Sequence, residues 1–329
     1  GYHRRSGSAH AEVIALHEAG ARSLNGTLYV SLEPCSHHGK TPPCVDRIIA
    51  GGIRRVVVGT LDPDPRVSGR GVQILTDHGI QVDVGCLRDA SILLNLSYFK
   101  RKLSLGSSIT VKVAMTIDGK IASAPGKRDA ITGSQAQQYV HKLRAMNDAV
   151  IIGIDTLLTD RPRLDCRSAP GLKPPAPVVL DSSLRFPEDY PWMHEGREFF
   201  VMCATDADDA KARRIEDSHG LVIRCSSSHG QLDLHDIINK LADLEKRRIL
   251  IEGGGRVLSS VIRRSSWDAL CVFISASLFG EDGVAVFPGQ EAFKNSSAVP
   301  VDAQRIGDDF LLRYLNNATR IDLGERLSR

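Results

Sequence analysis

Several features that would assign the chain to a special class are missing from its sequence. No apolar run is long enough to span a bilayer, so we expect no membrane-spanning segment. The formal net charge of +3 is spread along the chain rather than gathered into a basic tail, and aromatic residues make up only 5%. Nucleic-acid grooves combine clustered basic side chains with aromatic ones, so these absences argue against a nucleic-acid ligand. Small anionic ligands remain compatible with this composition.

A disulfide framework is also missing. The seven cysteines are odd in number and scattered over 329 residues, unlike those of a small secreted domain. They indicate a reducing compartment, and we expect a cytoplasmic protein. The chain opens "GYHRRSGSAHAEV", with neither an initiator methionine nor an apolar signal segment, and a helix is expected within ten residues. We therefore expect the sequence to start inside a domain.

Two domains of ordinary size fit this length, and both show the alternation of strands and helices that predicts an α/β fold. In the first hundred residues, "HAEVIALHEAGARS" predicts a helix and "GTLYVSLE" a buried strand, and three further helices alternate with two strands. A polar break at "KRKLSLGSS" precedes a second series, from "ITVKVAM" to a last strand at "FLLRYL". We place the boundary at residues 104 and 105, giving domains 1–104 and 105–329.

A zinc site is the strongest prediction for the first domain. A catalytic zinc site needs about three protein ligands and a proton shuttle. His10 and Glu12 stand at a predicted helix start, and Cys35 and Cys44 flank a proline-rich turn, "PCSHHGKTPPC". His-x-Glu followed by Pro-Cys and a further Cys is the signature of zinc-dependent nucleobase deaminases, in which the glutamate is the acid/base and not a ligand. The other interpretation of the two cysteines is that they are small buried hydrophobic residues.

His37 and His38 look like further ligands, but we expect them in a solvated loop. Two adjacent side chains cannot easily both serve a tetrahedral metal that already has three protein ligands. Lys40 in the same loop is either neutral surface or a substrate contact.

These motifs resemble the bifunctional riboflavin-biosynthesis deaminase/reductase family. "HAEVIAL" and "PCSHHGKTPPC" are similar to its deaminase part, and "ITVKVAMTIDGKIA" followed by "AITG" to its reductase part. The resemblance implies a cytidine-deaminase-like three-layer domain, N-terminally incomplete here, followed by a dihydrofolate-reductase-like α/β domain. It also implies the cofactors Zn2+ and NADPH.

A second site, for NADPH and a phosphorylated substrate, is expected from two segments of the reductase part. "LRAMNDAVIIGIDTLLTDRPRLDCR" spaces Arg144, Thr156, Asp160 and Arg167 over a helix, a strand and a loop. "RILIEGGGRVLSSVIRR" supplies glycines at a strand-to-helix turn, where backbone N–H groups can approach a pyrophosphate, although a bare "GGG" is equally a flexible turn. Guanidinium groups suit a phosphoribosyl substrate, although a lone arginine is often only surface charge.

The resemblance assigns these residues one by one. For NADPH it implies contacts with Ala114, Ala130, Thr156, Asp160, Gly253, Gly254, Gly255 and Arg256. For the substrates it implies contacts with Lys40, Arg128, Arg144, Leu164, Arg167 and Glu252. The chain departs from the family at Arg128 and Ala130, where a serine and a tryptophan are frequent, and at Arg161, which replaces an acid.

The predicted function is therefore two successive steps of riboflavin synthesis. The first is zinc-dependent deamination of a diaminopyrimidinone ribosyl phosphate, with Glu12 as acid/base. The second is NADPH-dependent reduction of the ribosyl group to a ribityl group. Two alternatives stay open: a monofunctional reductase with a non-catalytic deaminase-like module, and a nucleic-acid base deaminase, which the composition argues against. We expect small phosphoribosylaminopyrimidine substrates and a homo-oligomer, a dimer or tetramer.

Overall fold

The chain folds into two compact units. The structure, a computed structural model, describes residues 1–3, 7–39, 41–169, 171–288 and 297–327. One unit consists of Gly1–Leu105 together with Ala318–Arg329, and the other of Gly106–Asn317. The expected domains were 1–104 and 105–329, whereas the compact units divide after Leu105 and place Ala318–Arg329 with the first unit.

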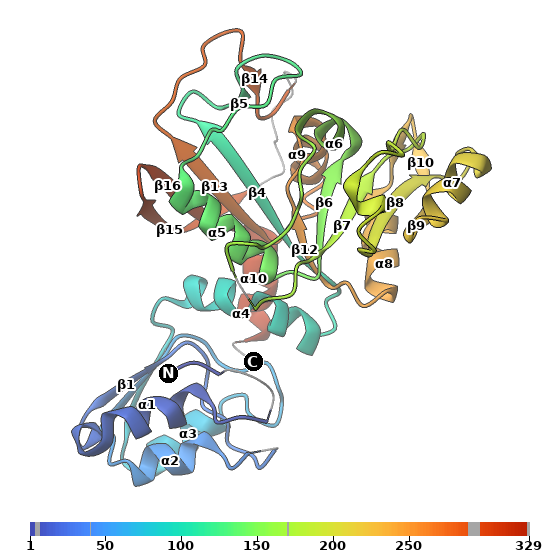
Figure 1. Ribbon diagram of the computed structural model, residues 1–329. Coiled ribbons are helices and arrows are strands. Elements are labelled where there is room, and N and C mark those ends of the chain that lie inside the picture. Colours follow the sequence, from blue (N-terminus) through green and yellow to red (C-terminus); the bar gives the residue numbers. More distant parts are fainter. Residues whose placement is uncertain (4–6, 40, 170, 289–296, 328–329) are drawn as a thin grey trace. The chain divides into compact units, whose positions relative to one another are not determined.

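The first unit alternates short strands with helices (Figure 1). Its elements are α1 (Ala11–Ala19), η1 (Gly20–Ser23), β1 (Thr27–Val30), α2 (Cys44–Ala50), β2 (Arg55–Val58), α3 (Arg70–Asp77), β3 (Gln81–Val84), α4 (Arg88–Lys102) and α10 (Asn317–Arg326). In the described residues, three parallel strands form its sheet in the order β1-β2-β3. The predicted order of strands and helices in this part of the chain is confirmed.

Strand β1 is not the buried strand that its apolar sequence predicts. Its residues alternate between exposed and half-buried positions, and Tyr29 is 70% exposed. The reason is position: β1 is an edge strand of the described sheet, whereas β2 lies in the middle and contributes Val56 and Val58 to the core. Helix α2 packs against this core through Val45 and Ile48.

The C-terminal helix α10, which the sequence did not lead us to expect, is tied to α4. The guanidinium of Arg320 donates to the Asp89 carboxylate at 2.8 and 2.9 Å. Arg88 donates to the carbonyl oxygen of Gly324 at 2.6 Å. These contacts join residues more than two hundred positions apart, which no local pattern reveals.

The second unit is built on one large sheet (Figure 1). Its elements are β4 (Ser108–Thr116), β5 (Lys120–Ala122), α5 (Ser134–Ala145), β6 (Ala149–Gly153), α6 (Ile154–Asp160), β7 (Ala176–Leu180), η2 (Pro191–Met193), β8 (Phe199–Ala204), α7 (Asp209–Glu216), β9 (Gly220–Cys225), β10 (Ser227–Ser228), β11 (Gln231–Leu232), α8 (Leu234–Asp243), β12 (Arg248–Ile251), α9 (Gly255–Arg263), β13 (Ala269–Ser275), β14 (Val284–Ala285), β15 (Ala298–Ile306) and β16 (Asp309–Asn316). Within the described residues, nine strands pair in the order β15-β16-β13-β4-β12-β6-β7-β8-β9. Pairing is parallel from β13 to β9, and β16 and β15 are antiparallel.

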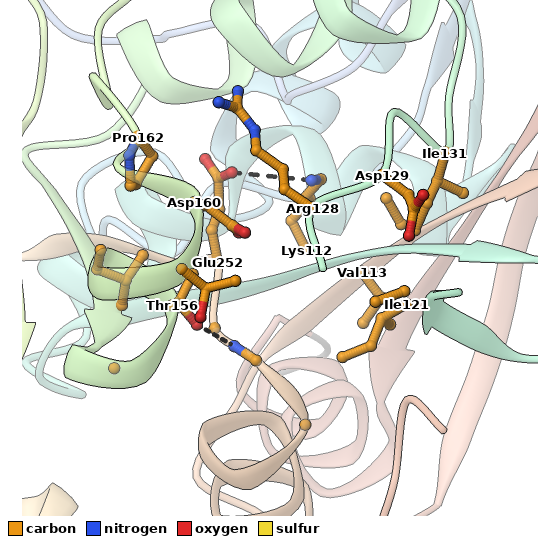
Figure 2. A pocket seen from close by; sticks show the side chains of 18 of the residues that line it. Lys112, Val113, Ile121, Arg128, Asp129, Ile131, Thr156, Asp160, Pro162 and Glu252 are labelled. Carbon is orange, nitrogen blue, oxygen red and sulfur yellow. Dashed lines mark hydrogen bonds and ion pairs between the residues drawn. The ribbon is translucent and has the colours of Figure 1, made fainter. Parts of the chain in front are cut away.

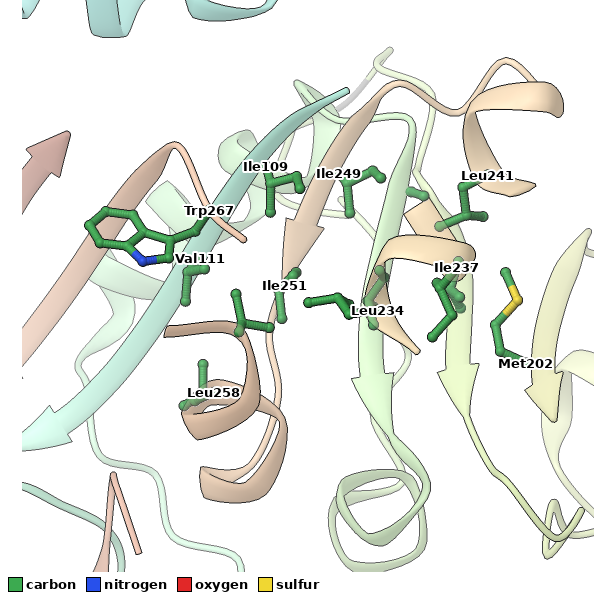
Figure 3. Packing of buried hydrophobic residues seen from close by; sticks show 14 of the residues in the cluster. Ile109, Val111, Met202, Leu234, Ile237, Leu241, Ile249, Ile251, Leu258 and Trp267 are labelled. Carbon is green, nitrogen blue, oxygen red and sulfur yellow. The ribbon is translucent and has the colours of Figure 1, made fainter. Parts of the chain in front are cut away.

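Helices cover both faces of this sheet, because its strands are apolar on both sides. On β12, Ile249 and Ile251 point into one core with α8 and α9, and Leu250 points into the other with α6 and α7. Figure 3 shows the first core, where Leu234, Ile237 and Leu241 of α8 face the strands. The unit is thus three-layered, as the alternation of strands and helices predicts. Among the helices of the described residues, none is long and apolar enough to cross a membrane.

The parallel strands β4, β12 and β6 lie side by side and end at the same edge of the sheet. This edge is where open α/β sheets bind ligands. The turn after β4 is held in place by Asp118, whose carboxylate accepts the backbone N–H groups of Phe279 (3.1 Å) and Gly280 (2.8 Å). The predicted Asp-Gly turn is confirmed, with Gly119 at φ 76°.

Truncating the centre of the core should destabilise the second unit. Ile251 is fully buried on the central strand β12, so Ile251→Ala is expected to lower the free energy of unfolding by about 2–5 kcal/mol through lost burial and a residual cavity. The matched control is Ile117→Ala, since Ile117 is 64% exposed and its truncation should cost less than about 0.5 kcal/mol. Denaturant unfolding followed by circular dichroism measures both. Equal losses for the two variants would contradict the assigned core.

Candidate active sites

The first candidate site is a group of metal-ligating side chains. The ligand atoms of His10, Cys35 and Cys44 all lie within 4.8 Å of one another. His10 Nδ1 is 3.2 Å from the sulfur of Cys44 and 3.5 Å from that of Cys35. Both cysteines are free thiols. One imidazole nitrogen and two thiols, all facing a common point, suit a catalytic zinc ion with one position left for water.

Helix starts position two of these three ligands. His10 is the N-cap of α1, and Cys44 is the first residue of α2, directly after Pro43. The backbone N–H of Cys44 donates to the sulfur of Cys35 at 3.3 Å. The N-terminal partial charge of a helix favours thiolates, so this geometry prepares the cysteines to bind a cation.

The two thiols influence each other's protonation. The hydrogen bond from Cys44 lowers the pKa of Cys35 to about 6, with smaller contributions from the Cys44 N–H and from His10. The same hydrogen bond, burial and then the nearby charge of Glu12 raise the pKa of Cys44. Glu12 therefore lies beside the ligand group, where a proton shuttle is needed.

The loop between the two cysteines contributes no further ligand to the group of His10, Cys35 and Cys44 among the described residues. The converging ligands among the described residues do not include His37 or His38, and His38 is exposed. Lys40, expected to contact substrate, lies outside the described residues. Sequence reasoning missed two neighbours of His10. The Thr41 hydroxyl is 3.5 Å from His10 Nε2, and the ring of His3 lies edge-on at 5.0 Å between centroids.

The second candidate site is an open cavity of about 1130 Å³ in the second unit. Figure 2 shows part of its lining, around Lys112, Thr156, Asp160 and Glu252. The cavity gathers every described residue that we expected to bind NADPH or substrate in this part of the chain: Ala114, Arg128, Ala130, Arg144, Thr156, Asp160, Leu164, Arg167, Glu252, Gly253, Gly254, Gly255 and Arg256. Residues spread over more than 140 sequence positions thus form one surface.

Basic side chains dominate this lining. Lysine and arginine contribute eight side chains to the cavity, and aspartate and glutamate contribute four. This excess of positive charge attracts phosphorylated ligands. Asp160 stands among the cations: burial raises the pKa of its carboxyl group, and the charges of Arg128 and Lys112 oppose that rise.

The glycine turn between β12 and α9 forms one wall. The N–H of Gly254 donates to the hydroxyl of Thr156 at 3.0 Å, which fixes the turn against α6 (Figure 2). A Cβ on Gly255 would come within 2.7 Å of Pro288 Cδ, and one on Gly254 within 3.0 Å of the Thr156 hydroxyl. Glycine at these two positions therefore lets the backbone at the start of α9 pack closely against Thr156 and Pro288, where a side chain would not fit.

Glu252 organises the floor of the cavity. Arg144 donates to its two carboxylate oxygens at 2.7 and 2.9 Å, and Lys112 Nζ lies 3.8 Å away. Burial by itself would raise the pKa of Glu252, but the charges of Arg144 and Lys112 outweigh it and hold that pKa below its usual value. The guanidinium of Arg144 is thus engaged by Glu252, in contrast to the free phosphate fork that we expected. Arg167, with a side chain 60% exposed, is accessible.

Sequence reasoning missed Lys112. Its side chain is only 17% exposed, and burial lowers its pKa. The signal was present: a lysine interrupts the apolar run "ITVKVAM" of a central strand, where a charge needs a partner. Leu164 lines the cavity as expected of a substrate contact, but the residue is only 2% exposed and belongs to a core cluster.

Family models match both units. The model described as "Cytidine and deoxycytidylate deaminase zinc-binding region" matches residues 1–60, and the one described as "RibD C-terminal domain" matches residues 107–312. The fold class is accordingly cytidine-deaminase-like followed by dihydrofolate-reductase-like, as predicted.

Individual relatives agree with these matches. The riboflavin biosynthesis protein RibD of Aquifex aeolicus is 38% identical over 281 residues, which cover 85% of this chain and 78% of the relative. RibD of Actinobacillus pleuropneumoniae is 34% identical over 322 residues, covering 96% and 85%.

A solved structure is similar over the same extent. It is a Thermotoga maritima protein described as a diaminohydroxyphosphoribosylaminopyrimidine deaminase/5-amino-6-(5-phosphoribosylamino)uracil reductase. It matches with a TM-score of 0.66 at 30% identity, covering 96% of this chain and 87% of that one. The chain belongs to the RibD family of bifunctional riboflavin-biosynthesis proteins.

Proposed function

We propose that the first unit deaminates 2,5-diamino-6-(5-phosphoribosylamino)pyrimidin-4(3H)-one and that the second unit reduces 5-amino-6-(5-phosphoribosylamino)uracil with NADPH. One observation carries this proposal. The metal-ligand group of His10, Cys35 and Cys44 lies in the unit that matches a deaminase zinc-binding region, and the cationic cavity lies in the unit that matches the RibD C-terminal domain.

In the deaminase site, His10, Cys35 and Cys44 would hold the zinc ion. Zinc in such a site makes water a stronger acid, so that hydroxide is available near neutral pH. Glu12, beside Cys44, would accept a proton from the attacking water and deliver it to the departing amine. Water and the ring amine thereby become a ring carbonyl and ammonia.

In the reductase site, Gly253, Gly254 and Gly255 would receive the cofactor's pyrophosphate at the start of α9. NADPH supplies the hydride. The hydride reduces the open-chain aldehyde carbon of the ribosyl group, and the aldehyde oxygen takes up a proton. Thr156 would keep the glycine turn in position through the Gly254 N–H. Asp160, also on α6, would orient the cofactor or the substrate.

The substrate phosphate would bind Arg167. Its guanidinium pairs with Asp165, but the side chain is 60% exposed at the cavity, whereas the guanidinium of Arg144 is buried in a bidentate pair with Glu252. We therefore propose Arg144 as a positioning residue, with Glu252 and Lys112 contacting the substrate on the floor of the cavity.

The proposal also includes the cellular compartment and the oligomeric state of the protein. All seven cysteines are free, which supports a reducing compartment such as the cytoplasm. A homo-oligomer, a dimer or tetramer, stays a prediction. A monofunctional reductase with a non-catalytic deaminase-like module would differ by binding no zinc and releasing no ammonia.

Glu12→Gln should separate the two activities. We expect the variant to keep its zinc and its fold while deamination falls by about two orders of magnitude or more, because the amide can neither accept nor return the proton. Ammonia release measures this step. Reduction of substrate that has already been deaminated is the internal control and should be unchanged; a parallel fall of both activities would contradict separate sites.

Metal content tests the ligand group directly. We expect one zinc per chain, with Cys44→Ser losing it because one of the three ligand atoms no longer binds as a thiolate. Cys86→Ser is the matched control, since Cys86 is an exposed thiol outside the group. Elemental analysis measures the zinc content of both variants, and zinc retained in full by Cys44→Ser would refute the assignment.

A chelator should abolish ammonia release and spare NADPH oxidation.

Gly254→Val tests the cofactor cradle. A side chain there would contact Thr156 and occupy the space through which the pyrophosphate approaches, so the NADPH dissociation constant should rise about tenfold or more, as for an overpacked site. Gly133→Val is the control: it is also a helix N-cap, with φ −72° and ψ 176° against −68° and 172°, but it does not line the cavity. Fluorescence titration with NADPH compares the two. Similar affinities for both variants would refute a cofactor at this turn.

A further inference from the structure

Hydrogen bonds to its backbone hold the loop of residues 161–167 at the rim of the cavity. Leu164 is buried, and Arg197 donates to the carbonyl oxygens of Arg163 (2.6 Å) and Leu164 (2.7 Å). The hydroxyl of Tyr190 donates to the carbonyl oxygen of Pro162 at 2.7 Å. Side chains on this loop can therefore exchange partners while its backbone stays in place.

Helix α5 holds the same loop from the other side. His141, 6% exposed, donates from Nδ1 to the carbonyl oxygen of Asp165 at 2.9 Å. Arg144 donates to that oxygen at 3.3 Å. The position of Asp165 is thus set by its backbone, independently of what its carboxylate binds.

The carboxylate of Asp165 is the shared partner of two arginines at the cavity. Arg167 Nη1 lies 2.6 Å and Arg163 Nε 3.3 Å from its oxygens. Both arginine side chains are largely exposed, 60% and 74%, whereas that of Asp165 is 18% exposed. Burial alone would raise the pKa of Asp165, but Arg167 and then Arg163 outweigh it and hold that pKa below its usual value. Asp165 is therefore an anion at neutral pH.

A carboxylate and a phosphate group make the same demand on a guanidinium, since both accept its N–H donors. In the structure Asp165 already meets this demand at Arg167, the residue to which the proposed function assigns the substrate phosphate. A second anion close to the carboxylate would be repelled by it, or would have to displace it from Arg167.

We propose that Asp165 is an internal counter-ion that competes with the substrate phosphate for Arg167 and so weakens the binding of phosphorylated substrates. The proposal rests on the proposed function, because it assumes that the phosphate binds at Arg167. When the phosphate arrives, Arg167 turns to the ligand and Asp165 keeps Arg163 as its partner. His141 Nδ1, 3.7 Å from a carboxylate oxygen, adds a second polar neighbour.

Asp165→Asn tests the competition, because it removes the charge and keeps the shape. We expect the KM for 5-amino-6-(5-phosphoribosylamino)uracil to fall about two- to fivefold, the range for one partly exposed ion pair. The inhibition constant of ribose 5-phosphate should fall by the same factor, whereas inhibition by ribose, which has no phosphate, should not change. Steady-state reduction by the full zinc-loaded chain measures all three, and Asp165→Ser repeats the test should the amide disturb the loop.

Asp189→Asn is the matched control for the loss of one negative charge. Asp189 pairs with Arg161 of the loop at 3.0 Å, whereas Arg167 pairs with Asp165, and the side chain of Asp189 is 73% exposed. We expect its KM to equal that of the parent chain. A fall in KM for both variants would show a general charge effect and overturn the specific role of Asp165.

Arg167→Ala separates the proposal from the function on which it rests. We expect this variant to raise the KM about tenfold or more. The double variant with Asp165→Asn should show no further change, because without the Arg167 guanidinium Asp165 and the phosphate no longer compete for one partner. An unchanged KM in Arg167→Ala would refute the phosphate contact itself. A raised KM in Arg167→Ala together with a raised KM in Asp165→Asn would keep the phosphate contact and refute the competition, since Asp165 would then be positioning Arg167 for its ligand.

Discussion

The ion pairs of Glu252 are the interaction on which the second site depends. A buried carboxylate needs compensating charges, and here two cations from separate elements supply them: Arg144 of α5 and Lys112 of β4. Because Glu252 directly follows the central strand β12, these contacts tie a helix and two strands together beneath the cavity. Loss of Glu252 would leave two largely buried cations without their shared partner, so the geometry of the floor depends on this carboxylate.

The two sites use opposite electrostatic designs. In the first unit, thiols and an imidazole converge on one point, with helix starts supplying a partial positive charge that favours anionic ligands for a metal. In the second unit, positive charge lines an open cavity and is partly neutralised from within by Glu252, Asp160 and, at the rim, Asp165. The first arrangement suits binding of a cation that assists a proton-transfer reaction. The second suits the binding of two phosphorylated molecules side by side.

The pairing of cavity arginines with carboxylates affects how tightly the cavity binds phosphate groups. A cavity with unpaired arginines would bind any phosphate, whereas arginines that already have carboxylate partners bind a ligand only if its contacts exceed those that it replaces. Arg144 and Arg167 illustrate two degrees of this effect. The guanidinium of Arg144 is buried and makes two hydrogen bonds to Glu252, while that of Arg167 is exposed and makes one to Asp165.

The sequence by itself determined what depends on short patterns. His10-Ala11-Glu12 and the Pro34-Cys35 turn carry the zinc prediction, and the alternation of apolar strands and helices carries the two α/β units, because ligand spacing and hydrophobic period are local properties. The same patterns located the glycine turn after β12 and the helix starts of the ligand group.

Only the tertiary structure decided which charges meet. Arg144 and Glu252 are 108 residues apart, so no local pattern could tell an arginine that binds a carboxylate from one that binds a phosphate. For the same reason the burial of Lys112, the exposed side of β1 and the return of α10 to the first unit followed from neighbours distant in sequence. Burial and pairing are properties of the assembled sheet and its covering helices, and they exist only once segments remote in the chain have packed together.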